Sequence, residues 1–390
     1  MARWSNWSGR LTARPRAIHF ARSEADAAAL LKQAAAAGIE VRAAGAGHSH
    51  APLVPSDGIV LDTSGLAGLI DADPSARTAT VGAGTLVYAL GAPLHRVGLA
   101  LINQGDIDRQ SIGGACATGT HGTGRTLQNL SAQVLGVRLA LISGELVDCD
   151  AEREPELWQA ARLGLGALGV VTALTLRVRD AYRLQERSWT APLETLLPDV
   201  DRHAAAARHF EFFWYPEDDR AVAKLIVETD APPRYPVGDE GSRIGWSHEV
   251  LPSHRPHPHT EMEYAVPASA GEACLLAIRE LIRRQFPAVR WPVEYRTVAA
   301  DDVWLSQAFE RDVVTISVHQ DVREDETRYF RACEEVFLDH QGRPHWGKLR
   351  YLGRDQLAAR HPAWARWWAV RDAVDPAGRL LNDHLRALRP

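Results

Sequence analysis

Residues 45–49 read Gly-Ala-Gly-His-Ser and directly follow a predicted strand, Ile39 to Ala44. A Rossmann dinucleotide fingerprint would add a third glycine and begin a helix at once, but Pro52 and Pro55 argue against a helix. A loop of small residues can instead present successive backbone N–H groups that bind an anion. The stretch therefore predicts a pyrophosphate-binding loop, although a plain surface turn explains this segment alone equally well.

Two more glycine-rich segments occur in the same half of the chain. Residues 111–124 read Ser-Ile-Gly-Gly-Ala-Cys-Ala-Thr-Gly-Thr-His-Gly-Thr-Gly, and residues 164–172 read Gly-Leu-Gly-Ala-Leu-Gly-Val-Val-Thr. So many small residues let the backbone approach a flat, bulky partner, and the hydroxyls of Ser111 and Thr118 can hydrogen-bond to ring edges. Three flexible loops are the alternative, but the apolar strands that closely flank these segments argue against it.

The first 180 residues alternate helical and strand patterns. Ser23 can cap a helix over Glu24 to Ala37 that ends at Gly38. The other elements predicted in this half are strands at 59–61, 78–81 and 170–178, a helix at 86–97, and a hairpin of 134–142 with 145–149. From about Asp180 tryptophan, proline and histidine become common. Strands at 210–215 and 261–266 and a helix at 272–284 predict a second, α+β domain there.

Bulk properties limit the possible functions. The length of 390 residues suggests two domains, and 46% hydrophobic with 24% charged residues is typical of a globular protein. A net charge of −5 without any basic block argues against nucleic acid as a partner. We expect neither a secretory signal nor a membrane span, because the required apolar runs are missing. Four widely separated cysteines are typical of free thiols in a reducing cytosol, so we expect a cytoplasmic protein.

The second half places charged side chains on strand faces. In residues 294–296, Glu-Tyr-Arg, strand alternation puts Glu294 and Arg296 on one face, where the carboxylate can fix the guanidinium. The same alternation groups His319 with two hydroxyl residues that precede it, and Lys348 lies in a loop between apolar segments. Taken alone, these residues fit an ordinary ion pair and a hydrogen-bonded core histidine better.

Two further patterns have simple structural explanations. Residues 254–259, His-Arg-Pro-His-Pro-His, have the spacing of metal ligands, but proline stiffens the backbone against converging ligands. We therefore predict no metal site. Trp364, Trp367 and Trp368 share a C-terminal helix, and we expect them to pack in the core and not to form a ligand platform.

With these segments in view, the chain resembles the vanillyl-alcohol-oxidase-type FAD proteins, and most of all their aldonolactone oxidases and alditol oxidases. The resemblance covers nearly the whole chain. It is carried by residues 45–49, 117–124 and 166–172 in the first half, and by residues 294–306 and 343–348 (Arg-Pro-His-Trp-Gly-Lys) in the second. His50 departs from the pattern, because many relatives carry an apolar or hydroxyl residue at that position.

The resemblance implies a fold class and a cofactor. The fold is α+β, with an FAD-binding PCMH-type domain over residues 1–180, an α+β substrate (cap) domain over 181–344, and a C-terminal segment over 345–390 that completes the active site and packs back on the FAD domain. FAD is expected to be covalently attached to His48 through its 8α-methyl group. The implied cofactor-binding residues are Ala44, Gly45, Ala46, Gly47, His48, Ser49, Ser111, Gly113, Gly114, Thr118, Gly119, His121, Gly122 and Val171.

The resemblance also assigns roles in chemistry. It implies catalytic roles for Glu294, Arg296, His319 and Lys348 and substrate contacts for Glu263 and Ser111. Oxidation of an alcohol by flavin removes a proton from oxygen and a hydride from carbon, which passes to flavin N5. Arg296 and Lys348 would stabilise the negative charge that develops on the substrate oxygen. His319 or Glu294 would accept the proton.

The expected function is therefore the FAD-dependent oxidation of an aldono-1,4-lactone of the gulono-, galactono- or arabinono- type, with O₂ or another electron acceptor as the second substrate. An alditol oxidase acting on xylitol or sorbitol is the main alternative. A flavin-binding protein without turnover is a further one, although such a protein has no use for a charged face beside the flavin.

Overall fold

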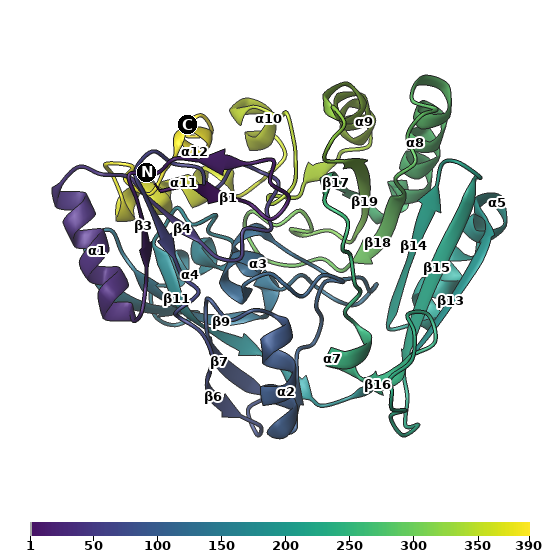
Figure 1. Cartoon of the computed structure of the whole chain (residues 1–390), viewed down its shortest axis with the longest axis horizontal. Coiled ribbons are helices and arrows are strands. Elements are labelled where there is room, and N and C mark those ends of the chain that lie inside the picture. The colour runs from purple at the N-terminus through teal and green to yellow at the C-terminus, as the bar shows by residue number, and fades with distance from the viewer. Residues whose placement is uncertain (1) are drawn as a thin grey trace.

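The structure, a computed structural model, describes residues 2–390. Its two halves lie side by side (Figure 1): the first, purple to blue, is built on a three-stranded and a five-stranded sheet with their helices, and the second, teal to green, is built on an eight-stranded sheet. The C-terminal residues, yellow in Figure 1, return to the first half. Among the described residues, no helix combines the length and the apolar character that a membrane span requires.

The first half contains eleven strands and four α-helices in the described part of the chain. They are β1 (Trp4–Ser5), β2 (Thr12–Ala13), β3 (Ala17–Phe20), α1 (Glu24–Ala36), β4 (Val41–Ala44), β5 (Ile59–Asp62), β6 (Leu69–Asp73), β7 (Thr78–Gly82), α2 (Tyr88–Arg96), β8 (Leu99–Ala100), α3 (Ile112–Thr118), β9 (Val134–Ala140), β10 (Leu146–Asp150), α4 (Pro155–Arg162) and β11 (Val170–Arg177). The order β3-β5-β4 forms a parallel sheet, and β10-β9-β11-β7-β6 forms an antiparallel sheet.

Helix α1 shows how the local sequence sets these elements. The Ser23 side chain accepts a hydrogen bond from the backbone N–H of Asp26, and acidic residues occupy the first turn. Its buried face includes Ala27 and Leu31, which belong to one core cluster with Val41 of β4. The helix and the parallel sheet therefore form a stable base for the loop that follows β4.

The second half and the C-terminal segment contain the remaining elements. They are β12 (Arg179–Asp180), β13 (Arg183–Pro192), α5 (Leu193–Leu196), α6 (Val200–Ala206), β14 (His209–Tyr215), β15 (Arg220–Glu228), β16 (Ile244–Trp246), α7 (Ser247–Val250), β17 (His259–Pro267), α8 (Gly271–Gln285), β18 (Val293–Val298), β19 (Val313–Asp321), α9 (Thr327–Asp339), β20 (Arg343–Pro344), α10 (Arg354–Ala358), α11 (Trp364–Val374) and α12 (Asp383–Arg386). The large sheet has the order β16-β13-β15-β14-β18-β19-β17-β20.

The two faces of the large sheet differ in character. On one face, Phe212, Tyr295, Ile316 and Tyr264 lie in a row across neighbouring strands, and Tyr264 stacks on Phe337 of α9 with ring centroids 5.0 Å apart. Burial of each such side chain stabilises the fold by roughly 1.5–3 kcal/mol. Helices α8 and α9 cover this apolar face, so the opposite face is left to meet the first half.

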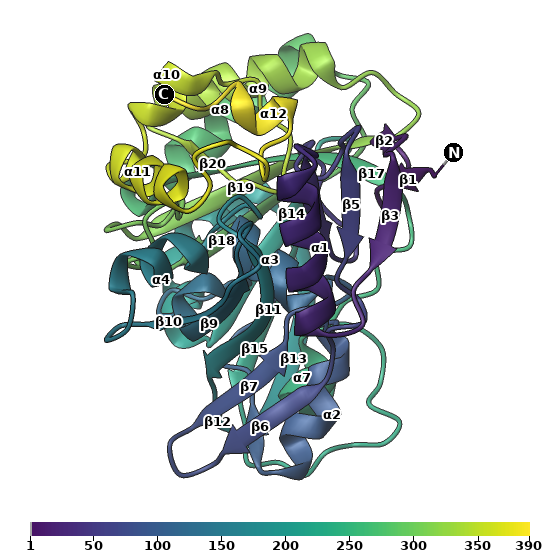
Figure 2. The same ribbon diagram turned by 90° about the vertical axis from the view of Figure 1, so that its left-hand side faces the viewer.

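The C-terminal segment packs against the first half, where α11 lies beside α4 (Figure 2). Trp367 donates its indole N–H to the carbonyls of Ala160 and Leu163, at 3.1 and 3.2 Å. The buried Arg42 of β4 donates to four backbone carbonyls, one of them that of Leu380. Trp364, Trp367 and Trp368 are buried, which confirms the prediction that they pack in the core.

The predicted elements are present, with boundaries shifted by a few residues. One helix was not predicted from the sequence. It is α3, which forms within the glycine-rich residues 111–124. Glycine disfavours a helix interior, but packing overrides propensity here. A methyl group at Gly113 would lie 2.8 Å from Ala83 Cβ, so only glycine lets this helix approach the residues after β7.

Candidate active site

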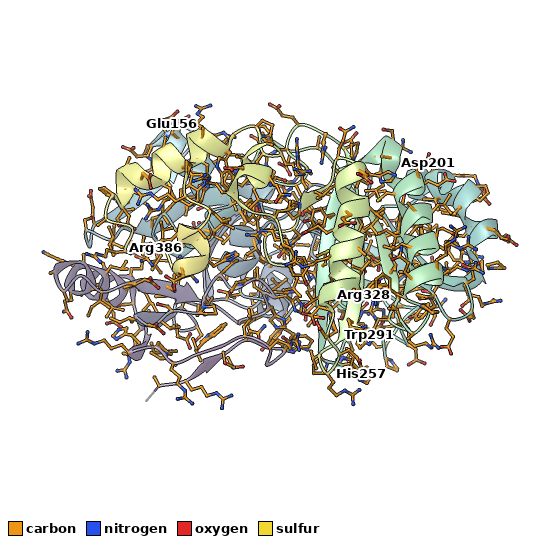
Figure 3. All side chains as sticks on the ribbon, turned by 90° about the horizontal axis from the view of Figure 1, so that it is seen from above. Glu156, Asp201, His257, Trp291, Arg328 and Arg386 are labelled. Atoms are coloured by element: carbon orange, nitrogen blue, oxygen red, sulfur yellow. The ribbon has the colours of Figure 1, made fainter. Side chains whose placement is uncertain are left out.

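A cavity of about 560 Å³ lies between the first half and the polar face of the large sheet. Its lining comes from the loop after β4, from α3, from residues 164–171 and from strands β17, β18 and β19. Trp291 and His257, labelled at one edge of the molecule in Figure 3, also line it. His257 is exposed and Trp291 half-buried, so these two residues mark the mouth of the cavity.

The loop over residues 45–49 is held from behind and turns its own donors to the cavity. Trp7 donates its backbone N–H to the carbonyl of Gly47 at 2.9 Å, and Asn6 Nδ2 donates to the carbonyl of Ser49 at 3.0 Å. Among the described residues, the N–H groups of residues 45–49 themselves donate to no backbone carbonyl. Successive N–H groups left without acceptors around one cavity form an anion site, and they fit a pyrophosphate.

The first two glycine-rich segments meet at this loop. A methyl group at Gly45 would lie 1.9 Å from Ser111 Oγ, so the loop after β4 and the start of α3 are in direct contact only because residue 45 is glycine. The far end of the cavity is apolar, lined by Leu139, Leu168 and Val171. The anion-binding loop of residues 45–49, called the nest below, fits the pyrophosphate of FAD. The apolar end of the cavity, called the slot, fits one of its flat rings.

Most of the expected cofactor residues line this cavity. They are Gly45, Ala46, Gly47, His48, Ser49, Ser111, Gly113, Gly114, Thr118, His121 and Val171. Ala44, Gly119 and Gly122 belong to the framework behind it. The Ala44 carbonyl accepts from Thr63, Gly119 ends α3 with a φ of 75°, and a methyl group at Gly122 would lie 2.2 Å from the carbonyl oxygen of Gln104.

His48 lies where this loop turns toward the large sheet. Its ring stacks on Trp7, with centroids 5.5 Å apart and planes 20° apart. Burial and the nearby charge of Lys348 lower the pKa of His48 to about 4. The imidazole is therefore neutral at neutral pH, which is the state that can form a bond to carbon.

Arg296 lies at the centre of a buried cluster of charges on the polar face of the sheet. Its Nε donates to Glu211 Oε2 at 2.8 Å, and its Nη2 lies 2.6 Å from Glu294 Oε1 and 3.2 Å from Asp106 Oδ2. Lys224 Nζ joins the cluster, 2.5 Å from Glu211 Oε1 and 3.2 Å from Asp106 Oδ1. Burial opposes the charge of Arg296, but the three carboxylates hold the pKa of its guanidinium well above its usual value.

The sequence analysis did not identify four charged residues of this cluster: Asp106, Glu211, Lys224 and Arg255. Arg255 joins the cluster through its Nη2, which lies 3.0 Å from Asp106 Oδ2. The pairing of β14 with β18 brings Glu211 opposite Arg296, and the pairing of β14 with β15 brings Lys224 opposite Glu211. The local sequence around each residue contains no signal for this pairing.

Glu294 has an unusual ionisation. Its burial raises the pKa of the carboxyl to about 8, helped by repulsion from Glu211 and Asp106 and opposed by the attraction of Arg296. At neutral pH the folded protein therefore favours the protonated acid at this position, which makes Glu294 a weaker candidate for accepting a proton from a substrate.

The raised pKa of Glu294 predicts that the free energy of unfolding depends on pH. The folded protein keeps a proton on Glu294 that the unfolded chain releases near its ordinary pKa of 4.5, so the free energy of unfolding falls as the pH rises from there through about 8. Glu294→Gln imitates the protonated acid and does not titrate. Between about pH 6 and about pH 9, urea unfolding should show stability shifting in favour of the variant.

The same variant tests the catalytic assignment of Glu294. Its turnover should fall below that of the wild type above about pH 8, where Glu294 ionises to a carboxylate that holds Arg296 more firmly than an amide can, while its FAD content stays normal. A variant that loses FAD would contradict the catalytic role of Glu294. A variant whose stability follows the same pH dependence as the wild type would contradict the raised pKa.

Lys348 and His319 meet at a second carboxylate, Glu261. The ammonium of Lys348 forms an ion pair with Glu261, and His319 Nε2 lies 3.8 Å from its Oε1. His319 Nδ1 lies 2.8 Å from the carbonyl of Pro292, which can only accept, so Nδ1 carries the proton of the neutral ring. Burial lowers the pKa of His319 to about 4. Its Nε2 is thus an available proton acceptor inside the cavity.

One histidine of the segment 254–259 lies in a cluster of potential metal ligands. Of its histidines, only His259 belongs to a cluster of potential ligands among the described residues, together with His50 and Glu261. His259 Nε2 and His50 Nε2 lie 3.7 and 3.9 Å from Glu261 Oε2, which also pairs with Lys348. The ammonium already supplies a cation at this carboxylate.

Glu263 lies two residues after Glu261 on β17, and both oxygens of its carboxylate accept hydrogen bonds from other side chains. Its Oε1 accepts from His121 Nε2 at 2.7 Å and from Gln307 Nε2 at 3.1 Å, and its Oε2 accepts from Ser317 Oγ at 3.0 Å. His121 Nδ1 lies 2.8 Å from the carbonyl of Gly122. Glu263 therefore orients His121 at the wall of the cavity.

Comparisons with known proteins agree with this geometry. Residues 15–150 match the family model of an FAD-binding domain, and residues 174–240 and 237–388 match that of D-arabinono-1,4-lactone oxidase. The chain is 36% identical to L-gulono-1,4-lactone dehydrogenase of Mycobacterium tuberculosis, over 98% of each chain, and 32% identical to alditol oxidase of a Streptomyces species, also over 98% of each. It is 27% identical to L-gulonolactone oxidase of Bos taurus, over 88% of each.

The fold has solved counterparts as well. A crystal structure of cholesterol oxidase from B. sterolicum superposes on the whole chain with a TM-score of 0.86, covering 96% of that enzyme at 17% sequence identity. This likeness, with the match to an FAD-binding domain, confirms the predicted class: an α+β fold of the vanillyl-alcohol-oxidase type.

Proposed function

We propose, because the chain belongs to the D-arabinono-1,4-lactone oxidase family of FAD-binding proteins, that it oxidises a sugar-derived aldono-1,4-lactone with FAD as cofactor. The observation that carries the proposal is the convergence of Arg296, Lys348 and His319 on one cavity that also contains the anion nest of residues 45–49. Two cations and one neutral base beside a flavin site are the groups that oxidation of a hydroxyl requires.

The cofactor would be held mostly by the first half. The N–H groups of residues 45–49 would bind its pyrophosphate, and the slot at Leu168 and Val171 would hold the adenine. When bound, FAD supplies the acceptor for the hydride that leaves the substrate carbon. The protein itself provides the charge, the proton acceptor and the exclusion of water.

His319 is the proposed proton acceptor. Its pKa of about 4 leaves Nε2 unprotonated at neutral pH, and the carbonyl of Pro292 fixes the tautomer that directs this nitrogen into the cavity. Lys348 and Arg296 would stabilise the negative charge on the substrate oxygen as the proton leaves. Arg296 is positioned for this by Glu211, Glu294 and Asp106, which occupy its Nε and Nη2 and leave Nη1 for a substrate.

Anaerobic spectroscopy tests the proposed function directly. The purified holoenzyme is mixed with L-gulono-, L-galactono- and D-arabinono-1,4-lactone and, in parallel, with xylitol and sorbitol, and the absorbance of the oxidised flavin is followed. We expect a lactone to bleach the flavin faster than any alditol. Bleaching by alditols alone would assign the protein to alditol oxidation, and no bleaching by either class would contradict an oxidoreductase of this type.

We also propose that FAD is attached covalently to His48. In support, His48 is neutral and half-buried, and it lies within the nest of residues 45–49 that lines the cavity. The flavin should remain with the protein after acid precipitation and fluoresce in a denaturing gel. His48→Ala should abolish the link yet retain dissociable FAD, because the nest uses backbone groups. His50→Ala, two residues away, is the matched control and should keep the link; a link lost in His50→Ala and kept in His48→Ala would overturn the assignment.

The remaining expectations are consistent with this role. All four cysteines are free and buried, which supports a location in the reducing cytoplasm. Oxygen or another small electron acceptor would reoxidise the flavin. Stopped-flow mixing of the reduced enzyme with air-saturated buffer distinguishes the two, because an oxidase regains its flavin absorbance within the time of one turnover.

A further inference from the structure

A row of aromatic rings extends from the loop of residues 45–49 to the mouth of the cavity. His48 stacks on Trp7, Trp7 meets His259 edge to face with centroids 5.5 Å apart, and His259 lies 5.4 Å from both Trp291 and His319. The row therefore connects the residue proposed to carry the flavin with the residue proposed to accept the proton. It ends at the mouth of the cavity, at Trp291.

Trp291 differs from the other members of this row. It is a half-buried tryptophan that lines the cavity, directly before Pro292, whose carbonyl holds His319 Nδ1 at 2.8 Å. Arg255 and Phe213 also line the cavity, with the guanidinium of Arg255 4.9 Å from the ring centre of Phe213. The cavity is therefore lined by a large apolar ring as well as by charged and polar groups such as Arg255 and His319.

We propose that Trp291 determines substrate class, by stacking on the C–H face of a cyclic sugar lactone. The face of an aromatic ring carries negative charge density, which attracts the slightly positive C–H groups of a sugar ring. A lactone ring presents such a face in one fixed conformation. An open-chain alditol has no fixed face and must lose the freedom of several rotatable bonds before it can lie on the indole. The inference rests on the proposed function and specifies why the site would favour lactones.

The test compares Trp291→Ala and Trp291→Phe with the wild type. Calorimetry on the chemically reduced holoenzyme, which cannot turn over, measures dissociation constants for L-gulono-1,4-lactone and xylitol. We expect Trp291→Ala to weaken lactone binding roughly fivefold to tenfold and xylitol binding by less than about twofold, with Trp291→Phe close to wild type. Trp246→Ala, which removes a half-buried indole on β16, is the matched control and should change neither constant.

Stopped-flow flavin reduction separates stacking from an indirect effect through Pro292. Stacking weakens lactone binding and leaves the limiting reduction rate within about threefold, whereas displacement of His319 lowers the rate itself. A lowered rate with unchanged binding, an equal loss for lactone and xylitol, or no detectable lactone binding to the reduced wild type would each overturn the inference. A lactone that binds with the expected dependence on Trp291 but never bleaches the wild-type flavin would refute the proposed function and leave the inference standing.

Discussion

Replacing Lys348 with methionine should slow anaerobic reduction of the flavin by roughly 10²–10³-fold, the loss typical of removing one preorganised charge-stabilising donor. Methionine keeps much of the apolar stem and removes the ammonium. Because the charge on the substrate oxygen develops only as the proton leaves, Lys348 should act on the transition state more than on the bound lactone. Stopped-flow reduction at several lactone concentrations gives both quantities, and the dissociation constant should change by no more than a few-fold.

Lys32→Met is the matched control for this experiment. Lys32 is exposed on α1, far from the lining of the cavity, so the same substitution there should leave the reduction rate unchanged. Weaker lactone binding with an unchanged rate in Lys348→Met would mean that the ammonium only holds the substrate, and another group would have to stabilise the charge.

Arg296→Met should lower both activity and stability. We expect a similar 10²–10³-fold loss in reduction rate, because a charged donor is removed from the site. The variant also leaves the carboxylates of Glu211 and Asp106 buried with fewer cations, and breaking a buried ion pair from one side typically costs 3–5 kcal/mol. Urea unfolding of the holoenzyme measures this loss.

Two comparisons make the stability part of this prediction specific. Arg296→Lys keeps a charge in the cluster and should recover much of the stability but little of the rate, because an ammonium cannot meet several oxygens in a planar arrangement. Arg279→Met breaks the more exposed pair with Asp219 and should cost less than about 1 kcal/mol. If Arg296→Met were as stable as Arg279→Met, the buried cluster would not contribute to the fold as described.

Local periodicity was sufficient to predict which catalytic candidates share a face. Strand alternation placed Glu294 and Arg296 together, and the register of β18 with β19 pairs them with Ser317 and Thr315 on the polar face, in line with His319. The same kind of evidence located α1 and α8 and the buried tryptophans of α11. Each of these inferences needs only residues within about a dozen positions of one another.

Long-range pairing could not be predicted in this way. Glu211 becomes a partner of Arg296 because β14 pairs with β18, 85 residues further along the chain. The sequence around Arg296 contains one carboxylate, at Glu294, and the structure shows three. The guanidinium of Arg296, which the sequence predicted to be fixed by Glu294 alone, is held by three acidic side chains that occupy its Nε and Nη2.

The return of residues 343–390 to the first half has a consequence for how the enzyme matures. On a ribosome these residues emerge last, after every strand except β20, yet they bring Lys348 to the cavity, and the carbonyl of Gly347 accepts the N–H groups of His50 and Ala51 beside the nest. A chain that stops before them lacks the Gly347 carbonyl and the Lys348 ammonium, which both belong to the lining of the cavity. We therefore expect the cofactor to be held stably only after the C-terminal segment has docked, and added riboflavin should not rescue variants whose C-terminal helices fail to dock.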